Sequence, residues 1–388
     1  MKRIIIFTGK GGVGKSSTAT AHAVKAAKMG IKTLILSTDM AHNLSDIFEK
    51  ELKSEPVKII DNLDAIEIDL NYEMDKNYSN IADAFSKMMP NMAEDITSEL
   101  ENIVVFPGIE ELFSLLKIKE FYDEGKYDLI IVDCAPTGET LSLLKFPELL
   151  SWYMEKLFPI GKVAMKVLRP VSKLAFKIEL PDKKAMNDIE KLYVKLGELQ
   201  ELLKNREVCS IRLVTVPEKM VVEETKRNYM YLNLYNFNVD GIYINRIIPE
   251  EVDNKFFSEW KVIQQNYLKE IINVFNDMPI YRIKWYDQDL NGIDGLLRVV
   301  DDSLNDNNIF NVLAEKNNEI FTKLEEGYQL EVNVPFVSKE KFDLYKNDDE
   351  IIIKINNFKR NIPLPNVIRK YDVSSAKLDD GKLNIIFS

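Results

Sequence analysis

The sequence has 388 residues, of which 46% are hydrophobic and 29% charged, and a formal net charge of −11 at pH 7. This length predicts one large domain with a smaller one beside it. The acidic balance argues against a nucleic-acid partner, and no apolar run approaches the ~20 residues that span a bilayer. The two cysteines, Cys134 and Cys209, support neither a disulfide framework nor a CxxC zinc site. Because the N-terminus has the pattern of a buried strand and not of a signal peptide, we expect a cytoplasmic protein.

The first predicted elements are a strand, a glycine-rich loop and a helix. Ile4–Phe7 is an apolar run, and the alanine-rich residues 18–29 have a helical pattern. Residues 9–16 between them fit G-x-x-x-x-G-K-[ST], in which backbone N–H groups surround phosphate oxygens. In that motif Lys15 reaches the terminal phosphates and the hydroxyl of Ser16 holds Mg²⁺. The predicted nucleotide-binding residues of this loop are Gly9, Lys10, Gly11, Gly12, Val13, Gly14, Lys15, Ser16 and Ser17.

Two further strands end in acidic residues. Lys32–Ser37 leads into a polar segment that contains Asp39, and residues 127–132 (YDLIIV) are followed by Asp133. Open α/β sheets place their ligand chemistry at such strand ends. A carboxylate beside the γ-phosphate orients the attacking water, and an aspartate after a later strand supports Mg²⁺. Asp133 fits the second of these roles, and Asp39 is a candidate for the ligand chemistry of this edge, with a turn or helix cap as its alternative.

Several segments, in this order, resemble one family of dimeric P-loop ATPases. The family includes the arsenical-pump ATPase and the ATPase that targets tail-anchored membrane proteins, and the resemblance covers the whole chain. The segments are KGGVGKSS at residues 10–17, STDMAHNLSDIF at 37–48, DCAPTGETLSLLKFP at 133–147, the Glu224, Thr225 and Arg227 signature, and Asn245 at a strand end.

The resemblance implies roles for individual residues. Lys10 would reach the nucleotide of a partner subunit, which predicts a homodimer with nucleotide sandwiched between its subunits; a surface lysine near phosphate is the alternative. Asp39 would position or deprotonate water, so the predicted catalytic residues are Asp39, Lys10 and Lys15. Asn245 would read the adenine, because an amide both donates and accepts hydrogen bonds; a strand-ending turn is its alternative. The predicted switch residues, which would sense the γ-phosphate, are His42, Asn43, Pro136, Thr137 and Gly138.

This chain departs from the family pattern in places. Met40 replaces a proline, Cys134 a threonine and Glu139 a histidine. The cysteines that bind zinc or arsenite in some members are absent, so no zinc site is predicted. A segment near residues 278–296 is a weaker match to the loop beside the adenine, where Tyr286 and Asp287 are the residues of interest.

A helical subdomain is predicted at roughly residues 72–120 and 145–204. The first part is rich in methionine, which suits an irregular core or an adaptable apolar surface. Residues 148–177 are dense in aromatic and apolar side chains interleaved with lysines. In membrane-protein-targeting members the corresponding insertion forms a groove for a client helix. An ordinary helical lid is an equal alternative here.

From residue 326 the pattern alternates with period two and is interrupted by Pro, Asn-Asp-Asp and Asp-Asp-Gly turns, which predicts about six short strands. Residues 328–335, 360–365 and 376–387 resemble the small-heat-shock-protein (α-crystallin) domain. We therefore expect residues 326–388 to form an all-β sandwich that serves in interaction or packing.

Together these features predict an α/β P-loop NTPase, residues 1–325, with a mainly parallel sheet flanked by helices, an inserted helical subdomain and a small C-terminal all-β sandwich. The expected function is Mg²⁺-dependent ATP hydrolysis, with ATP and Mg²⁺ as cofactors. Hydrolysis would open and close a homodimer around a hydrophobic polypeptide client, such as a segment of a membrane protein, and a partner in the membrane is a further expectation. An ATPase subunit of an arsenite or anion efflux pump is one alternative. A non-enzymatic nucleotide-binding holdase or scaffold is the other.

Overall fold

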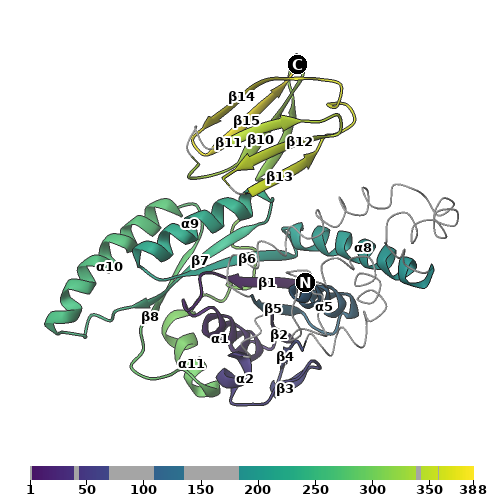
Figure 1. Ribbon diagram of the computed structural model, residues 1–388. Helices are drawn as coiled ribbons and strands as arrows, with labels where there is room; N and C mark the ends of the chain where they lie inside the picture. The colour runs from purple at the N-terminus through teal and green to yellow at the C-terminus, as the bar shows by residue number, and fades with distance from the viewer. Residues whose placement is uncertain (1, 39–42, 70–108, 135–182, 338–341, 357) are drawn as a thin grey trace, which may run out of the picture.

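The computed structural model describes residues 2–38, 43–69, 109–134, 183–337, 342–356 and 358–388 (Figure 1). The strands of its larger sheet are Arg3–Thr8 (β1), Thr33–Ser37 (β2), Val57–Ile60 (β3), Leu63–Glu67 (β4), Leu129–Asp133 (β5), Cys209–Thr215 (β6), Val239–Ile247 (β7) and Ile280–Lys284 (β8). Their order is β3-β4-β2-β5-β1-β6-β7-β8. All pairs are parallel except β3 with β4. The predicted mainly parallel sheet is confirmed.

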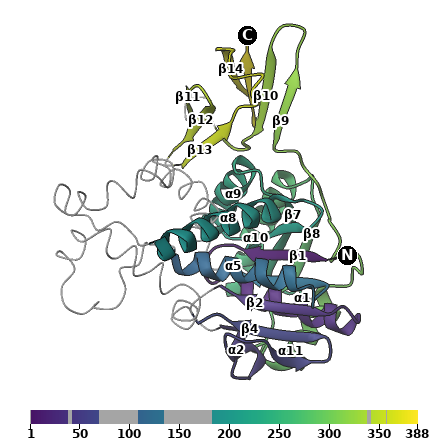
Figure 2. The ribbon, with the colours of Figure 1, turned by 90° about the vertical axis from the view of Figure 1, so that its right-hand side faces the viewer.

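Helices cover both faces of this sheet (Figures 1 and 2). They are Lys15–Lys28 (α1), Asn43–Phe48 (α2), Ile109–Glu124 (α5), Lys183–Lys204 (α8), Lys219–Leu234 (α9), Lys255–Val274 (α10) and Gly292–Ser303 (α11). Because successive side chains of a strand point to opposite faces, β1 contributes to two cores. Ile5 and Phe7 pack with side chains of α1, α2 and α11, whereas Ile4 and Ile6 pack with those of α5, α8, α9 and α10.

The central strands are buried along their whole length, which explains why they appear in the sequence as uninterrupted apolar runs. Every residue of β1, β2, β5 and β6 is buried. Being parallel, these strands all end at one edge of the sheet. The glycine-rich loop and Asp133 therefore meet at that edge, where ligands of open α/β sheets bind.

The C-terminal part forms two antiparallel sheets. Its strands are Glu319–Lys323 (β9), Tyr328–Asn333 (β10), Phe342–Lys346 (β11), Glu350–Ile355 (β12), Phe358–Pro363 (β13), Val373–Asp379 (β14) and Lys382–Phe387 (β15). The sheet orders are β14-β15-β10-β9 and β11-β12-β13. Buried residues alternate along the strands, as in Leu330 and Val332 of one sheet and Ile351 and Ile353 of the other. The predicted all-β domain is confirmed, and β9 adds an edge strand before residue 326.

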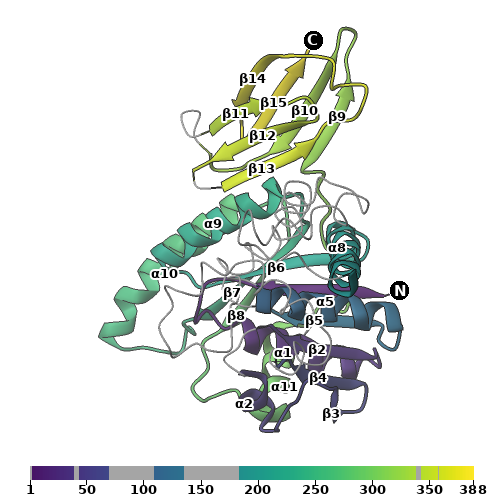
Figure 3. The ribbon, with the colours of Figure 1, turned by 45° about the vertical axis from the view of Figure 1, so that its right-hand side comes forward.

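This β domain rests on the C-terminal half of α9 (Figures 2 and 3). The ring of Phe358 packs against that of Tyr231, with 3.5 Å between centroids. The hydroxyl of Tyr235 donates a hydrogen bond to the Lys359 carbonyl at 2.8 Å. The guanidinium of Arg360 lies 5.5 Å from the Tyr235 ring centre. The contact is therefore aromatic at its centre.

Only part of the predicted helical subdomain belongs to the described residues, namely α5 and α8. These two helices pack against each other and the sheet through Leu115, Leu192 and Leu196. The methionine-rich part of residues 72–108 and the aromatic segment 148–177 lie outside the described residues. No helix in the described ranges is both long and apolar enough to cross a membrane.

Candidate functional site

The glycine-rich loop joins β1 to α1 through two left-handed residues. Gly12 and Gly14 have φ values of 79° and 91°, a region that glycine enters without steric cost. Helix α1 begins at Lys15, and no described side chain caps its N-terminus at Gly14. Its first N–H groups are thus left for an anion, which the helix dipole also favours. The loop fits a phosphate group by its backbone geometry.

Two glycines of the loop approach their neighbours too closely for any side chain. A Cβ on Gly9 would lie 2.2 Å from the Val214 carbonyl oxygen, and one on Gly14 would lie 2.2 Å from Nδ2 of Asn245. The first contact fixes the start of the loop against β6, and the second fixes its end against β7. The spacing of glycines in the motif thus reflects contacts with the sheet as well as with phosphate.

Asn245 holds the loop with its side-chain amide. Its Nδ2 donates to the Val13 carbonyl at 2.9 Å, and its Oδ1 accepts from the Arg246 N–H at 2.8 Å. Arg246 has a φ of 56°, and its carbonyl accepts from Nε2 of the buried Gln264 at 3.0 Å. One N–H of the Asn245 amide remains for a further partner. Asn245, predicted to read adenine, is therefore positioned beside the loop by two main-chain contacts.

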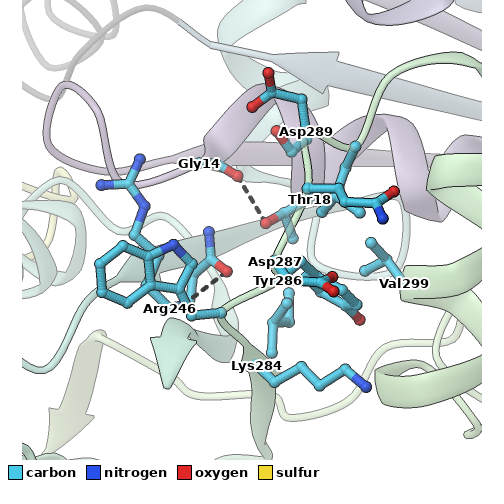
Figure 4. A pocket seen from close by; sticks show the side chains of 14 residues that line it. Gly14, Thr18, Arg246, Lys284, Tyr286, Asp287, Asp289 and Val299 are labelled. Carbon is cyan, nitrogen blue, oxygen red and sulfur yellow. Dashed lines mark hydrogen bonds between the residues drawn. The ribbon is translucent and has the colours of Figure 1, made fainter. Parts of the chain in front are cut away.

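A cavity of about 460 Å³ opens between the loop and the segment that follows β8 (Figure 4). One wall is formed by Gly14, Ser17 and Thr18, where the Thr18 hydroxyl donates to the Gly14 carbonyl at 2.7 Å. The rest of the lining is formed by Asn245, Arg246, Ile283, Lys284, Trp285, Tyr286, Asp287, Gln288, Asp289, Leu290 and Val299. The structure thus brings the suspected residues Tyr286 and Asp287 into one cavity with the P-loop.

The sequence reasoning missed Arg246, Lys284 and Trp285 as lining residues. Arg246 is the last residue but one of β7, Lys284 ends β8 and Trp285 follows it. Their position at the carboxyl ends of parallel strands was the available signal. The Tyr286 ring lies between two cations, with Lys284 Nζ and the Arg298 guanidinium each 5.2 Å from its centre. Burial raises the pKa of Tyr286 to about 12, so its hydroxyl is neutral. The cavity therefore offers an uncharged aromatic side chain in its wall.

Lys10 makes an ion pair within its own chain. Its Nζ lies 3.7 Å from Oε2 of Glu224 in α9, and the two side chains are 34% and 29% exposed. An ion pair with this exposure contributes ~1 kcal/mol or less. Lys10, which is predicted to act across a dimer, thus makes a weak ion pair with Glu224 of the Glu-Thr-x-Arg segment.

Asp133 and Ser16 are the residues predicted to serve Mg²⁺. Asp133 ends β5, is fully buried, and stands in register with Phe7 of β1 and Ser37 of β2. The Cys134 N–H donates to the Phe7 carbonyl at 3.0 Å, which fixes this strand end beside the start of the loop. Ser16 is the second residue of α1. Carboxylate and hydroxyl oxygens are the kinds of ligand that Mg²⁺ prefers, and the roles of Asp133 and Ser16 toward Mg²⁺ stay predictions.

The remaining predicted site residues fall largely outside the described ranges. Asp39, His42 and Pro136–Gly138 lie outside the described residues, as do the departures Met40 and Glu139. Asn43 is the first residue of α2. Lys15 is buried at the start of α1. The structure therefore describes the glycine-rich loop and the cavity beside it, while the roles of the predicted site residues stay predictions.

A buried polar network lies on the α1 side of the loop, and the sequence analysis missed it. Arg212 and Asp240 are fully buried and form an ion pair of 3.2 Å. Arg212 Nη1 donates to the Tyr243 hydroxyl at 3.2 Å, and Tyr243 lies 3.0 Å from Nε2 of His22. Nδ1 of His22 lies 2.7 Å from the Thr18 carbonyl. The network links β6 and β7 to α1 one turn beyond the phosphate loop.

The direction of these hydrogen bonds follows from their partners. The Thr18 carbonyl only accepts, so Nδ1 of His22 carries the hydrogen and Nε2 accepts from Tyr243. Tyr243 can then accept from Arg212, which donates only. Burial, assisted by the charge of Arg212, lowers the pKa of His22 to about 3. Burial also raises the pKa of Tyr243, so both groups stay neutral in the folded protein.

The same network holds the segment that leads to the β domain. Arg212 Nη2 donates to the Ile309 carbonyl at 2.5 Å, and Asp240 Oδ2 accepts from the Leu313 N–H at 3.1 Å. Arg3 Nε donates to the Phe310 carbonyl at 3.3 Å. These contacts satisfy buried charges with main-chain groups of the segment after α11. The helix of the phosphate loop and the domain linker are thus joined by one set of bonds.

Comparison with known proteins identifies relatives of the whole chain. A family model described as anion-transporting ATPase matches residues 2–306, and a model of the HSP20-like domain found in ArsA matches residues 325–387. An Aquifex aeolicus protein named as an arsenical pump-driving ATPase is 32% identical over all of both chains. One from Chlorobaculum tepidum, named likewise, is 35% identical over 99% of this chain and 96% of its own.

A Pyrenophora tritici-repentis protein named ATPase get3 is 28% identical over 75% of this chain and 87% of its own. The first two matches cover nearly all of this chain, whereas the third covers 75% of it. This difference is consistent with an ATPase domain that all three proteins share and a C-terminal domain that only some relatives carry. By the extent of these matches, the chain belongs to the anion-transporting ATPase family and carries that family's HSP20-like domain.

Proposed function

We propose that this family ATPase hydrolyses ATP with Mg²⁺ in a homodimer, and that the resulting change of shape handles a hydrophobic polypeptide segment. The observation that carries the nucleotide part is that Gly14, Asn245 and Tyr286 line one cavity. Its P-loop wall suits phosphates, and the rest of its lining offers an aromatic ring and an amide N–H group to a base. An adenine nucleotide matches this division of polar and aromatic groups.

The proposed reaction depends on how this chain's residues meet charge. Lys15 and the first N–H groups of α1 stabilise negative charge on the terminal phosphate. When bound, Mg²⁺ neutralises charge between the phosphates; Ser16 would hold it, with Asp133 in support. Asp39 would orient the attacking water, as the resemblance implies. Lys10 would leave Glu224 and contact the nucleotide of the second subunit.

Substitution of Asp39 by asparagine tests the enzymatic proposal. Loss of the carboxylate is expected to lower the rate of phosphate release by about 10²-fold or more while ATP remains bound. Asp46→Asn, an exposed aspartate of the adjacent helix α2, is the matched control and keeps the wild-type rate. Equal rates in wild type and Asp39→Asn would leave the non-enzymatic holdase or scaffold as the better account.

The client part of the proposal rests on the apolar segment 148–177, on the family resemblance and on the HSP20-like domain. It is tested with a fluorescent apolar peptide of transmembrane length and a polar peptide of equal length. The Asp39→Asn protein with ATP is expected to bind the apolar peptide at least tenfold more tightly than the polar one. Equal binding of both peptides would contradict it.

The efflux-pump alternative has support in the names of two relatives that match nearly the whole chain. Trivalent arsenic seeks several thiolates, and the chain has two cysteines, both buried. Cys209 stands in register with Ile4, near the start of β1. Cys134 follows Asp133, which stands in register with Phe7 near the end of β1, so the two cysteines lie toward opposite ends of this strand. Burial raises the pKa of Cys209 to about 12. Stimulation of ATP hydrolysis by arsenite would favour this alternative over ours.

A further inference from the structure

Gln264 is a buried polar residue of α10 to which the proposed function gives no role. It is 8% exposed, whereas the next residue, Gln265, is exposed. Oε1 of Gln264 accepts from the Ile248 N–H at 3.0 Å, and its Nε2 donates to the Arg246 carbonyl at 3.0 Å. An amide suits this task because it accepts and donates at once. One side chain thus binds two main-chain groups at the end of β7.

The main chain that Gln264 binds has an unusual conformation. Arg246 has a φ of 56°, a left-handed value that few residues other than glycine, asparagine and aspartate adopt. The register of β7 against β8 is irregular between Ile244 and Ile247. Strained residues persist only where the surrounding contacts fix them. The two bonds of Gln264 lie on either side of Ile247 and are contacts of this kind.

The same stretch of main chain places two residues that line the cavity. The Arg246 N–H donates to Oδ1 of Asn245 at 2.8 Å, one of the bonds drawn in Figure 4. The carbonyl of Ile247 accepts from the Trp285 N–H at 2.8 Å. Asn245 and Trp285 both belong to the cavity lining. The main chain held by Gln264 therefore leads by one hydrogen bond to each of them.

We propose that Gln264 is a positioning residue for the nucleotide base, because it fixes the left-handed main chain of Arg246 and thereby places the Asn245 amide and the Trp285 side chain at the cavity. The proposal rests on the proposed function, in which an adenine nucleotide occupies that cavity. Gln264 lies behind these residues and is not itself part of the lining. The P-loop still binds phosphate when Gln264 is changed. Loss of Gln264 therefore weakens the contribution of the base to the affinity more than that of the phosphates.

The test measures, by isothermal titration calorimetry, the affinity of the full chain for a non-hydrolysable ATP analogue and for inorganic tripolyphosphate. The ratio of the two affinities reports what the nucleoside contributes. Gln264→Glu keeps the size of the side chain, but its carboxylate only accepts and has no hydrogen to donate to the Arg246 carbonyl. This variant is expected to lower the ratio by about tenfold or more. Gln264→Met, which loses both bonds, is expected to lower it to a similar extent.

Gln265→Glu and Gln265→Met make the same changes at the exposed neighbour and are expected to leave both affinities at their wild-type values. Tripolyphosphate binding by the Gln264 variants, together with their urea unfolding midpoints, shows that they are folded. An unchanged ratio in these variants, with both affinities kept or both lowered equally, overturns the positioning role. The nucleotide site would still stand in that case, because the wild type prefers the ATP analogue. A wild-type chain that binds the analogue no more tightly than tripolyphosphate overturns the adenine site and this proposal with it.

Discussion

Two ion pairs on different sides of the phosphate loop use the same chemistry in different surroundings. Arg212 and Asp240 are fully buried, and their other hydrogen bonds go to the Tyr243 hydroxyl and to main-chain atoms of the linker. Lys10 and Glu224 are about one-third exposed and 3.7 Å apart. Water competes for the second pair and is excluded from the first. The buried pair is therefore a fixed part of the fold, whereas the partly exposed Lys10–Glu224 pair can separate and exchange partners.

The largest effect is expected from breaking the buried pair. Asp240→Asn leaves the Arg212 guanidinium, and the nearby Arg3, without a buried counter-charge. Removing one partner of a buried pair typically costs about 3–5 kcal/mol. Urea unfolding should show this loss in the apparent free energy of unfolding. Asp306→Asn, an exposed aspartate of the same linker, serves as the control; a loss no larger than in that control would mean that the pair contributes little.

The next effect comes from the hydroxyl that joins Arg212 to His22. Tyr243→Phe keeps the ring and its 4.8 Å stacking on Tyr281 but leaves a guanidinium N–H and an imidazole nitrogen without partners. Two unsatisfied buried groups are expected to cost about 2–3 kcal/mol. Thermal or urea unfolding measures the loss. An unchanged midpoint would indicate that a water replaces the hydroxyl.

A pH series sharpens the role of His22. Its pKa is about 3 in the folded protein and near 6.5 when unfolded. Between these values only the unfolded chain takes up the proton, so stability is complete above about pH 6.5 and falls as the pH drops. The expected loss from pH 7 to pH 5 is about 2 kcal/mol. His22→Gln, which cannot titrate, should lack this part of the slope, and parallel slopes would contradict the assignment.

The smallest effect on stability is expected at the exposed pair. Glu224→Gln should change the free energy of unfolding by ~1 kcal/mol or less. The same change releases Lys10 and is expected to tighten the proposed dimer, formed with a non-hydrolysable ATP analogue, by up to about fivefold, as measured by light scattering. Glu223→Gln, the exposed neighbour that pairs with Lys226, is the control. A weaker dimer in Glu224→Gln would show that the Lys10–Glu224 ion pair supports dimerisation and does not compete with it.

The sequence predicted those features whose signal is local. The apolar runs of β1, β2, β5 and β6 are buried on both faces, and the loop of residues 9–16 lies between a strand and a helix as its motif requires. The alternation of apolar and polar residues in the C-terminal domain likewise predicted its strands from residue 326 onward. Strand β9 was not predicted, because its five residues, EIFTK, are mostly half-buried or exposed and lack a clear alternation.

The features that the sequence could not predict depend on distant contacts. His22 and Tyr243 are separated by 221 positions, and Arg212 and the Ile309 carbonyl by 97. Nothing local distinguishes Arg212 from a surface arginine until the strand order places it beside Asp240. A single histidine within an alanine and threonine run of the first helix was the one local sign of a buried polar partner.

The attachment of the linker to the ATPase core bears on how the two domains can be separated for study. The match to the ATPase family ends at residue 306, yet Ile309, Phe310 and Leu313 supply the main-chain groups that Arg212, Arg3 and Asp240 bind. A fragment that ends at residue 306 would lack these main-chain groups and would leave the buried charged side chains of Arg212, Arg3 and Asp240 without these partners. A fragment extended past Leu313, to the residues just before β9, keeps every one of these bonds and is the natural unit for isolating the ATPase.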